Sequence, residues 1–371
     1  MIERVRVTWN DLVQGGKTPW SIYDHRGKLL VKAGTMLKRS MIEKMTNYIM
    51  YRDKRPGDYE CLTEDPRVNA FDKFREFVWR LESLFKDIEA ENKDAKVKLK
   101  RIVRDIINLV EHEPDATIAC VHLPSDYPYS FFHPLQCAIL CAMVSRRDKQ
   151  SQQERELLVA AALTCNISMR ELQEELFRHK GNITAIQRTD IEQHPEESVK
   201  MLVKAGITYP QLLDIVRDHH ERNDGSGYPY GIEMQEISRG AVILAVTDSY
   251  CAMVTSRSYR KPLPVKDALS EFLVDKGKLY DETIGLMLIK ETSVFPPGSF
   301  VKLKNGEIAL VIRRGRANPM QPIVKSIFGP AGNRYANPLM RDCGNDEYKI
   351  TGILGARPNT PLNVSKLWEY L

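Results

Sequence analysis

Residues 219–229 read HHERNDGSGYP, and this stretch decides how the rest of the chain is interpreted. Its two histidines, His219 and His220, follow apolar residues at helical spacing in 212–216, so they are expected at the end of a helix. Neutral imidazole is a common ligand of metal ions such as iron and zinc. The two glycines that follow let a bound phosphate approach the backbone closely. The stretch therefore predicts a metal and phosphate site, and the alternative is that the glycines form only a turn.

Asp248 lies inside an apolar helical stretch, residues 241–254. Burying a carboxylate without a partner is costly, so a cation is expected beside it, and a helix cap or a salt bridge is the alternative. His133 and His194 are further candidate ligands, although a lone histidine is more often a satisfied surface or core residue. That ordinary interpretation is given to His112, His122 and His179.

Taken in order along the chain, these motifs and their neighbours resemble the HD-GYP family of cyclic di-GMP phosphodiesterases. The resemblance covers roughly residues 115–295, with suitable spacing between the motifs. The matching positions are Tyr127 to His133, His194 with Pro195, His219 to Glu221, Asp224 to Pro229, Asp248, and Arg257 to Arg260.

The resemblance implies a role for each matching residue. The implied metal ligands are His133, His194, His219, His220 and Asp248. The implied ligand-binding residues are Gly225, Gly227, Arg257 and Arg260. Arginine binds phosphate through parallel hydrogen bonds, although a surface salt bridge is the alternative for both arginines. Tyr228 and Pro229 are expected to contact a partner, since the family's Gly-Tyr-Pro loop is implicated in contacts with diguanylate cyclase domains.

The chain departs from the family where members carry a His-Asp pair. Residues 163–169 read LTCNISM, so Cys165 stands for the histidine, Asn166 for the aspartate and Ser168 for a glycine. Tyr129 stands where some members have a glutamate. No catalytic residue is therefore assigned at these positions.

The family's aspartate is expected to bridge two metal ions, and the neutral amide of Asn166 supplies no charge to offset their repulsion. We therefore expect one divalent ion, iron, manganese or zinc, and a two-ion site that is lost or greatly weakened. Cys165 has two interpretations. It is either a thiolate ligand of zinc or ferrous iron, or a small buried hydrophobe in a site that no longer binds metal.

The hydrophobic pattern predicts a mainly α protein with an all-helical central domain, a small mixed N-terminal module and a small β-rich C-terminal domain. The expected divisions are a module over 1–65, a helical linker over 66–114, the HD-GYP-like domain over 115–295 and the β-rich domain over 296–371. Strands are expected at 20–23 and 29–31, a helix from 40 to 49, and a hairpin at 300–312 with its turn at Asn305 and Gly306. Two helices are expected over 66–111, and their apolar stripe suggests packing in the core or against a second copy of the chain.

The composition limits the class of protein. No stretch approaches the ~18 apolar residues that span a bilayer, and the first residues have no apolar core, so we expect a cytoplasmic protein without a secretory signal. The seven cysteines are odd in number and mostly lie in apolar runs, which fits a reducing compartment. A net charge of +5 permits an anionic ligand without requiring nucleic acid.

These observations leave three functional hypotheses. The first is a degenerate HD-GYP signalling protein that senses cyclic di-GMP or a related cyclic dinucleotide, or docks a partner, with little or no hydrolysis. The second is a metal-dependent cyclic di-GMP phosphodiesterase with an atypical metal site. The third is an adaptor that binds neither metal nor nucleotide.

Overall fold

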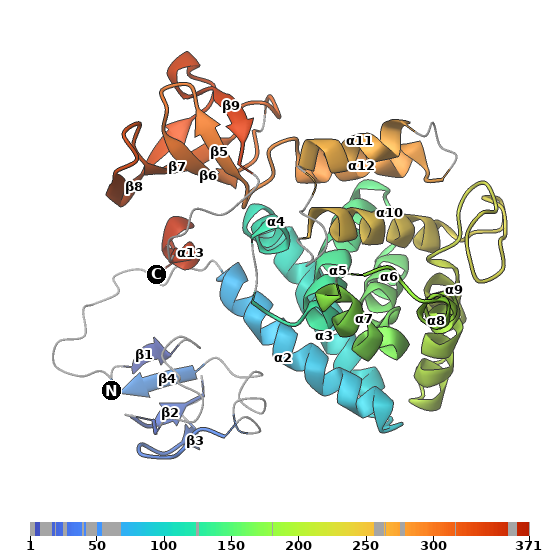
Figure 1. Ribbon diagram of the computed structural model, residues 1–371. Helices are drawn as coiled ribbons and strands as arrows, with labels where there is room; N and C mark the ends of the chain where they lie inside the picture. Colours follow the sequence, from blue (N-terminus) through green and yellow to red (C-terminus); the bar gives the residue numbers. More distant parts are fainter. Residues whose placement is uncertain are drawn as a thin grey trace.

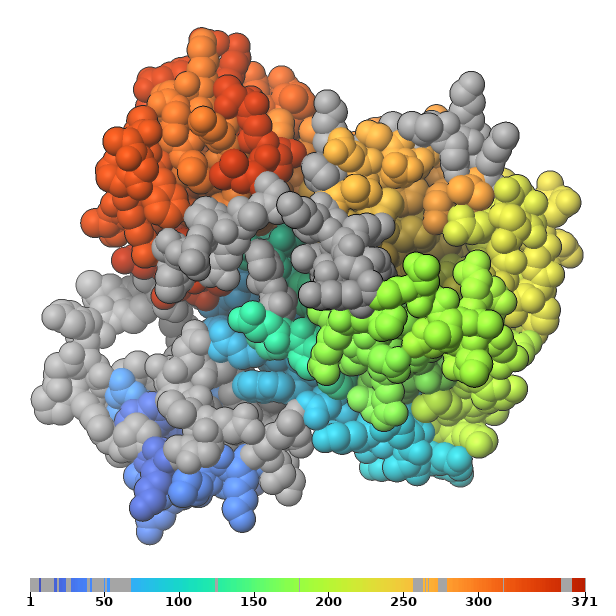
Figure 2. Space-filling view, in the orientation of Figure 1, coloured from blue at the N-terminus to red at the C-terminus, as the bar shows by residue number. Residues whose placement is uncertain are grey.

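The computed structural model describes residues 4–7, 17–18, 20–24, 28–38, 41, 50–53, 68–123, 126–179, 181–255, 263, 265–274, 279–315, 317–354 and 362–370. A helical body occupies the middle of the chain, with a small sheet before it and a larger sheet after it (Figure 1). Figure 2 shows both sheets, blue and orange-red, on the same side of the helical body. The predicted fold class is confirmed.

The N-terminal sheet has four antiparallel strands in the order β1-β4-β2-β3. Their bounds are β1 Arg4–Val7, β2 Ile22–Tyr23, β3 Leu29–Val31 and β4 Met50–Asp53. Its small core packs against Trp79 of the first long helix, which ties the sheet to the helical body. The strands predicted at 20–23 and 29–31 are confirmed, while the helix predicted over 40–49 falls largely outside the described residues.

The helical body consists of helices joined by short turns. They are α2 Ala70–Glu89, α3 Ala95–His112, α4 Pro114–His122, α5 Tyr129–Arg147, α6 Gln152–Thr164, α7 Arg170–Arg178, α8 Ala185–Lys204, α9 Pro210–Asp218, α10 Arg239–Val254, α11 Val265–Val274 and α12 Glu282–Thr292, with a 3₁₀ turn, η2, at Ile167–Met169. The two helices predicted over 66–111 are α2 and α3, and both bury their apolar faces in the core shared with α5.

Helix α5 runs through the middle of this core. Residues 129–145 are buried on every side, so the helix has no solvent face. A helix that is buried all round is a core helix rather than an amphipathic surface helix. It packs along α6 and α10 and therefore carries any polar side chain on it into the interior, where that side chain needs a partner.

The C-terminal sheet has five antiparallel strands in the order β8-β7-β6-β5-β9. Their bounds are β5 Phe300–Leu303, β6 Ile308–Arg313, β7 Ile323–Phe328, β8 Arg334–Asp342 and β9 Ile350–Ile353, with a 3₁₀ turn, η3, at Asp346–Tyr348. The hairpin predicted at 300–312 is confirmed as β5 and β6.

After this sheet the chain returns to the helical body. Helix α13, Val364–Leu367, leads into Trp368 and Tyr370, which pack against Phe71 at the start of α2 with ring centroids 5.0 and 6.1 Å away. Residues near the end of the sequence thus complete the core at its first helix. Among the described ranges, no helix is both long and apolar enough to cross a membrane.

Candidate metal centre

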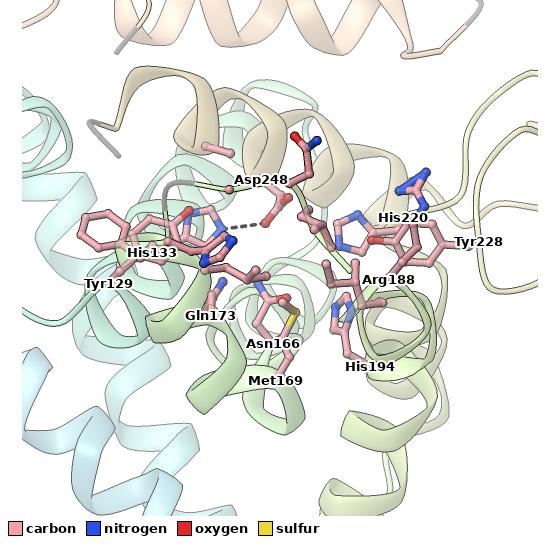
Figure 3. Close-up of a pocket in the computed structure, with 18 residues that line it drawn as sticks. Tyr129, His133, Asn166, Met169, Gln173, Arg188, His194, His220, Tyr228 and Asp248 are labelled. Carbon is pink, nitrogen blue, oxygen red and sulfur yellow. Dashed lines mark hydrogen bonds and ion pairs between the residues drawn. The ribbon is translucent and has the colours of Figure 1, made fainter. Parts of the chain in front are cut away.

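A cavity of about 670 Å³ opens between α5, η2, α7, α8, α10 and the turn after α9. Figure 3 shows Asn166 on its wall, between His133 on one side and His194 on the other. The residues that line it include Tyr129, His133, Asn166, His179, Asn182, Arg188, His194, His220, Tyr228 and Asp248. The cavity lies within the range of volumes, roughly 300–1,000 Å³, typical of small-molecule sites.

The first cluster of candidate ligands is His194, His219 and His220. His194 lies on α8, and the other two histidines lie where α9 ends. The Nε2 atoms of His194 and His219 are 3.3 Å apart. The ring of His220 packs on both of the other rings, with centroids 5.1 and 4.1 Å away. The sequence predicted His194, His219 and His220 as metal ligands, and the structure brings these three residues together.

Backbone carbonyls fix the orientation of two of these rings. Nδ1 of His194 donates to the carbonyl of Ile191 at 2.5 Å, and Nδ1 of His219 donates to the carbonyl of Val216 at 2.6 Å. Burial lowers the pKa of His194 to about 3, with His219 adding to the effect, and burial likewise lowers the pKa of His219 and of His220. The rings are therefore neutral near pH 7, and the Nε2 atoms of His194 and His219 face each other as lone-pair acceptors.

Two acceptors that face each other at this distance repel unless a cation or a proton lies between them. Metal-ligating histidines generally donate their second ring nitrogen to a backbone carbonyl or a carboxylate, which is the arrangement seen here. The residues of the first cluster therefore fit a divalent ion.

The second cluster is His133, Cys137 and Asp248. His133 and Cys137 are one turn apart on α5, and Asp248 faces them from α10. Nε2 of His133 is 2.8 Å from Oδ1 of Asp248, and Sγ of Cys137 is 3.7 Å from that nitrogen and 4.0 Å from that oxygen. The structure thus brings together the predicted ligands His133 and Asp248 and adds a thiol.

The electrostatics of the second cluster follow from burial and close pairing. Burial alone would lower the pKa of His133, but Cys137 and Asp248 raise it to about 10. Burial opposes ionisation of Asp248, yet His133 and the neighbouring histidines hold its pKa well below its usual range. The His133 ring also stacks on Tyr129, at 5.0 Å between centroids, and Tyr129 stacks on Phe177 at 4.8 Å.

Cys165 and Asn166, the residues at the family's His-Asp positions, have different surroundings. Cys165 is 1% exposed, and its thiol donates to the carbonyl of Ala162 at 3.8 Å. Cys165 is part of neither cluster among the described residues. Asn166 lines the cavity. Ser168 donates to the carbonyl of His194 at 2.8 Å and pairs with Ser198 at 2.9 Å, so it fastens the turn that carries Asn166 to helix α8.

The glycine loop is held together from inside. The buried carboxylate of Glu221 accepts hydrogen bonds from the backbone nitrogens of Tyr230, Gly231 and Ile232 at 2.7, 3.2 and 3.2 Å. A Cβ at Gly227 would lie 2.5 Å from the nitrogen of Arg222, within the loop's own backbone. Gly225 has a φ of +74°, which favours glycine. Glycine at 225 and 227 is therefore required by the fold of the loop itself.

The loop turns Tyr228 toward the candidate ligands His194 and His220. Its ring stacks on His220 with centroids 4.7 Å apart and lies 6.3 Å from the ring of His194. Tyr228 and Pro229 are both half-buried and are joined by a cis peptide bond. The predicted partner-docking residue is thus also part of the cavity wall.

Two predicted ligand-binding residues, Arg257 and Arg260, lie outside the described residues. Cys137 was not among the ligands predicted from the sequence, although its spacing of four from His133 on a helix places both on one face. Arg188 lines the cavity from α8, and no motif singled it out.

Comparison with known proteins shows similarity in the central region. Residues 105–284 match the model of the HD domain. Cyclic di-GMP phosphodiesterase PA4108 of Pseudomonas aeruginosa is 25% identical over 292 residues, which are 78% of this chain and 70% of that protein. The cyclic di-GMP phosphodiesterase of Thermotoga maritima is 37% identical over 105 residues, which are 28% of each protein.

A solved structure shares the fold. Bd1817, an HDG"Y"P protein from Bdellovibrio bacteriovorus, aligns with a TM-score of 0.54 at 13% identity, covering 78% of this chain and 99% of that one.

Proposed function

We propose that this chain binds a cyclic dinucleotide in the cavity and hydrolyses it weakly or not at all. The match of residues 105–284 to the HD domain model and the low-identity relatives among the cyclic di-GMP phosphodiesterases support this proposal. The observation that carries the proposal is the position of Asn166. It lies on the cavity wall between the two clusters of candidate ligands, where it presents a neutral amide.

Metal ions in such a site polarise a phosphodiester and lower the pKa of bound water. The first cluster would hold one divalent ion through three neutral nitrogens, and the second cluster offers a carboxylate, an imidazole and a thiol. Two unit charges 4 Å apart repel by about 4 kcal/mol in a protein-like medium, and two doubly charged ions repel about four times as strongly. A bridging carboxylate would offset part of that repulsion, and an amide does not.

The cavity is suited to an anionic, nucleotide-sized ligand. Its volume is about 670 Å³. Arg188 reaches it from α8 with its side chain 69% exposed, and its nearest ion-pair partner, Glu192, is 3.5 Å away. An exposed guanidinium exchanges such a weak pair for a phosphate at little cost, since phosphate accepts two parallel hydrogen bonds from it. We assign ligand phosphates to Arg188 together with Arg257 and Arg260.

A metal-dependent cyclic di-GMP phosphodiesterase with an atypical metal site is the second candidate. It is favoured by the two clusters, because they contain all five ligand residues implied by the sequence, His133, His194, His219, His220 and Asp248. An activity of this kind would not need the bridging carboxylate if each cluster held its own ion.

One pair of measurements separates the candidates. Purified protein is analysed for iron, manganese and zinc, and the same sample is incubated with cyclic di-GMP while linear dinucleotide and GMP are quantified. The proposal expects binding of cyclic di-GMP by calorimetry and turnover far below ~10 per second, the median for enzymes. Turnover near that median establishes the second candidate. An absence of both metal and nucleotide binding leaves only an adaptor.

Docking of a diguanylate cyclase domain on Tyr228 and Pro229 is a separate part of the proposal. Because Tyr228 stacks on His220, a partner that contacts this loop would also affect the position of the candidate ligand His220. A pull-down with purified diguanylate cyclase domain tests the contact. Pro229→Ala is expected to weaken capture, and unchanged capture removes the loop from the contact.

A further inference from the structure

Helices α5 and α10 pack side by side and bring three different ligand types to one buried point. His133 and Cys137 project from the same face of α5, since residues four apart lie above one another on a helix. Asp248 meets them from α10. Their exposed fractions are 2%, 0% and 8%, respectively. The cluster therefore combines a nitrogen, a sulfur and an oxygen atom away from bulk water.

The spacing of these atoms is close to that of a tetrahedral metal site. At usual zinc bond lengths, tetrahedral ligands lie about 3.3 Å apart for nitrogen and oxygen and about 3.5 Å apart when one is sulfur. The corresponding separations here are 2.8 Å from His133 to Asp248, 3.7 Å from Cys137 to His133 and 4.0 Å from Cys137 to Asp248. Shifts of about half an ångström in these atoms would bring the three separations to those of a tetrahedral zinc site.

The described residues of this cluster are held by one short contact. Nε2 of His133 lies 2.8 Å from Oδ1 of Asp248, and an ion between these two atoms would replace that hydrogen bond. The other ring nitrogen, Nδ1, is buried and has no hydrogen-bond partner among the described residues. His133 and Asp248 also line the cavity while Cys137 lies behind them, so an ion can enter from the cavity.

We propose that Cys137 is a thiolate ligand of a divalent cation held with His133 and Asp248, and that this thiolate makes the cluster select zinc over manganese and magnesium. The Cys137 thiol loses its proton to solvent as the metal–sulfur bond forms. One thiolate and one carboxylate then balance the two charges of the ion, which leaves the buried cluster neutral. Thiolates favour zinc, whereas oxygen ligands suit magnesium and manganese.

Burial raises the pKa of the Cys137 thiol, and its contact with Cys251 on α10 raises that pKa further. The metal-free thiol is therefore protonated, and metal binding must displace this proton. The inference needs no nucleotide and does not depend on the proposed function, because it concerns the side chains of this cluster alone.

Cobalt reports on the cluster directly, because a cobalt–thiolate bond gives a charge-transfer band in the near ultraviolet that nitrogen and oxygen ligands do not give. The full chain is stripped of metal, loaded with cobalt and compared with three variants. We expect the band in the wild type and its loss in Cys137→Ser. It should persist in Cys141→Ser, the matched control, whose sulfur lies 3.1 Å from the Thr247 hydroxyl instead. It should persist as well in Cys165→Ser, which tests the cysteine at the family's histidine position.

A second measurement requires no variant to fold. X-ray absorption at the zinc edge of the loaded wild type should show one sulfur at about 2.3 Å from the metal, and zinc should displace manganese in competition dialysis. The proposal is overturned by a zinc or cobalt site without sulfur, by a failure of the chain to bind either ion, or by a thiolate band that survives Cys137→Ser and disappears in Cys165→Ser.

Discussion

The Nε2 atoms of His194 and His219 lie 3.3 Å apart, while the opposite nitrogen of each ring donates to a backbone carbonyl. Neither ring can relieve the contact by turning over without losing that hydrogen bond. The backbone of α8 and of the turn after α9 therefore presents two lone pairs to one point, which is preorganisation for a cation.

Removing one of these nitrogens should release metal. His219→Ala is expected to lower metal affinity by more than the tenfold to hundredfold typical of losing an outer-shell partner, as measured by competition with a coloured chelator. His179→Ala is the matched control, because His179 lines the cavity but belongs to neither cluster. Equal metal loss in both variants would show that the cluster is not the binding site.

Restoring the family pair should increase the metal content. Cys165→His combined with Asn166→Asp adds an imidazole and a carboxylate beside ligands that are already in place. We expect a higher metal-to-protein ratio by elemental analysis. Asn182→Asp adds the same charge elsewhere on the cavity wall and should leave the ratio unchanged. A folded double variant that binds no more metal than wild type would contradict the assignment of these two positions.

The loop that carries Tyr228 should not tolerate a side chain at residue 227. Gly227→Ala places a Cβ 2.5 Å from backbone atoms of Glu221 and Arg222, which cannot move as a flexible side chain would. Overpacking of this kind costs about 1–3 kcal/mol or more, so the thermal midpoint should fall. Gly352→Ala, where no atom lies within 4 Å of the added Cβ, should change it far less.

Ligand binding should depend on Arg188. Losing a hydrogen bond to a charged group costs ~1.5–3 kcal/mol, or about tenfold to a hundredfold in dissociation constant. Arg188→Ala should weaken binding of cyclic di-GMP on that scale in calorimetry, as should Arg257→Ala and Arg260→Ala. Arg178→Ala, at an exposed arginine outside the cavity, should not. Unchanged affinity in Arg188→Ala would remove this residue from the site.

The C-terminal sheet should weaken in acid through Glu307. Two hydrogen bonds from Arg341, at 2.9 and 3.0 Å, lower the pKa of Glu307 from 4.5 to about 2, against the opposing effect of burial. A carboxyl with a lowered pKa stabilises the folded state above its unfolded pKa, and the contribution is lost as the pH falls through the folded value. The difference in thermal midpoint between wild type and Glu307→Gln should therefore have its full value above pH 4.5 and should shrink toward zero near pH 2. A gap that stays constant across this range would contradict the assignment.

Local patterns in the sequence were enough to predict much of this fold. Apolar residues at three- and four-residue steps predicted α2 and α3, and the turn residues Asn305 and Gly306 predicted the β5–β6 hairpin, because each pattern reports the burial of its own segment. Strand β8 was missed. It is an edge strand with mostly exposed side chains and Pro338, so it lacks the alternating apolar pattern that marks a half-buried strand.

The site was predictable where its residues form a motif. His219 and His220 were found together, and His194 was added because His194 and Pro195 resemble the family's His-Pro step. Cys137 was not found, because its role depends on α10 packing against α5, a contact between residues 111 positions apart. The close approach of the backbone to Gly227 was also not predicted. Its neighbour is the backbone of residues 220–222, and a sequence does not show which backbone approaches a glycine.

The return of α13 to Phe71 has a practical consequence for the excision of fragments. A fragment cut before residue 362 would leave the aromatic surface at the start of α2 uncovered, since Trp368 and Tyr370 cover it in the intact chain. Uncovered aromatic surface of this kind promotes self-association. Fragments meant to isolate the helical body should therefore keep the tail by fusion, or replace Phe71 with a polar residue.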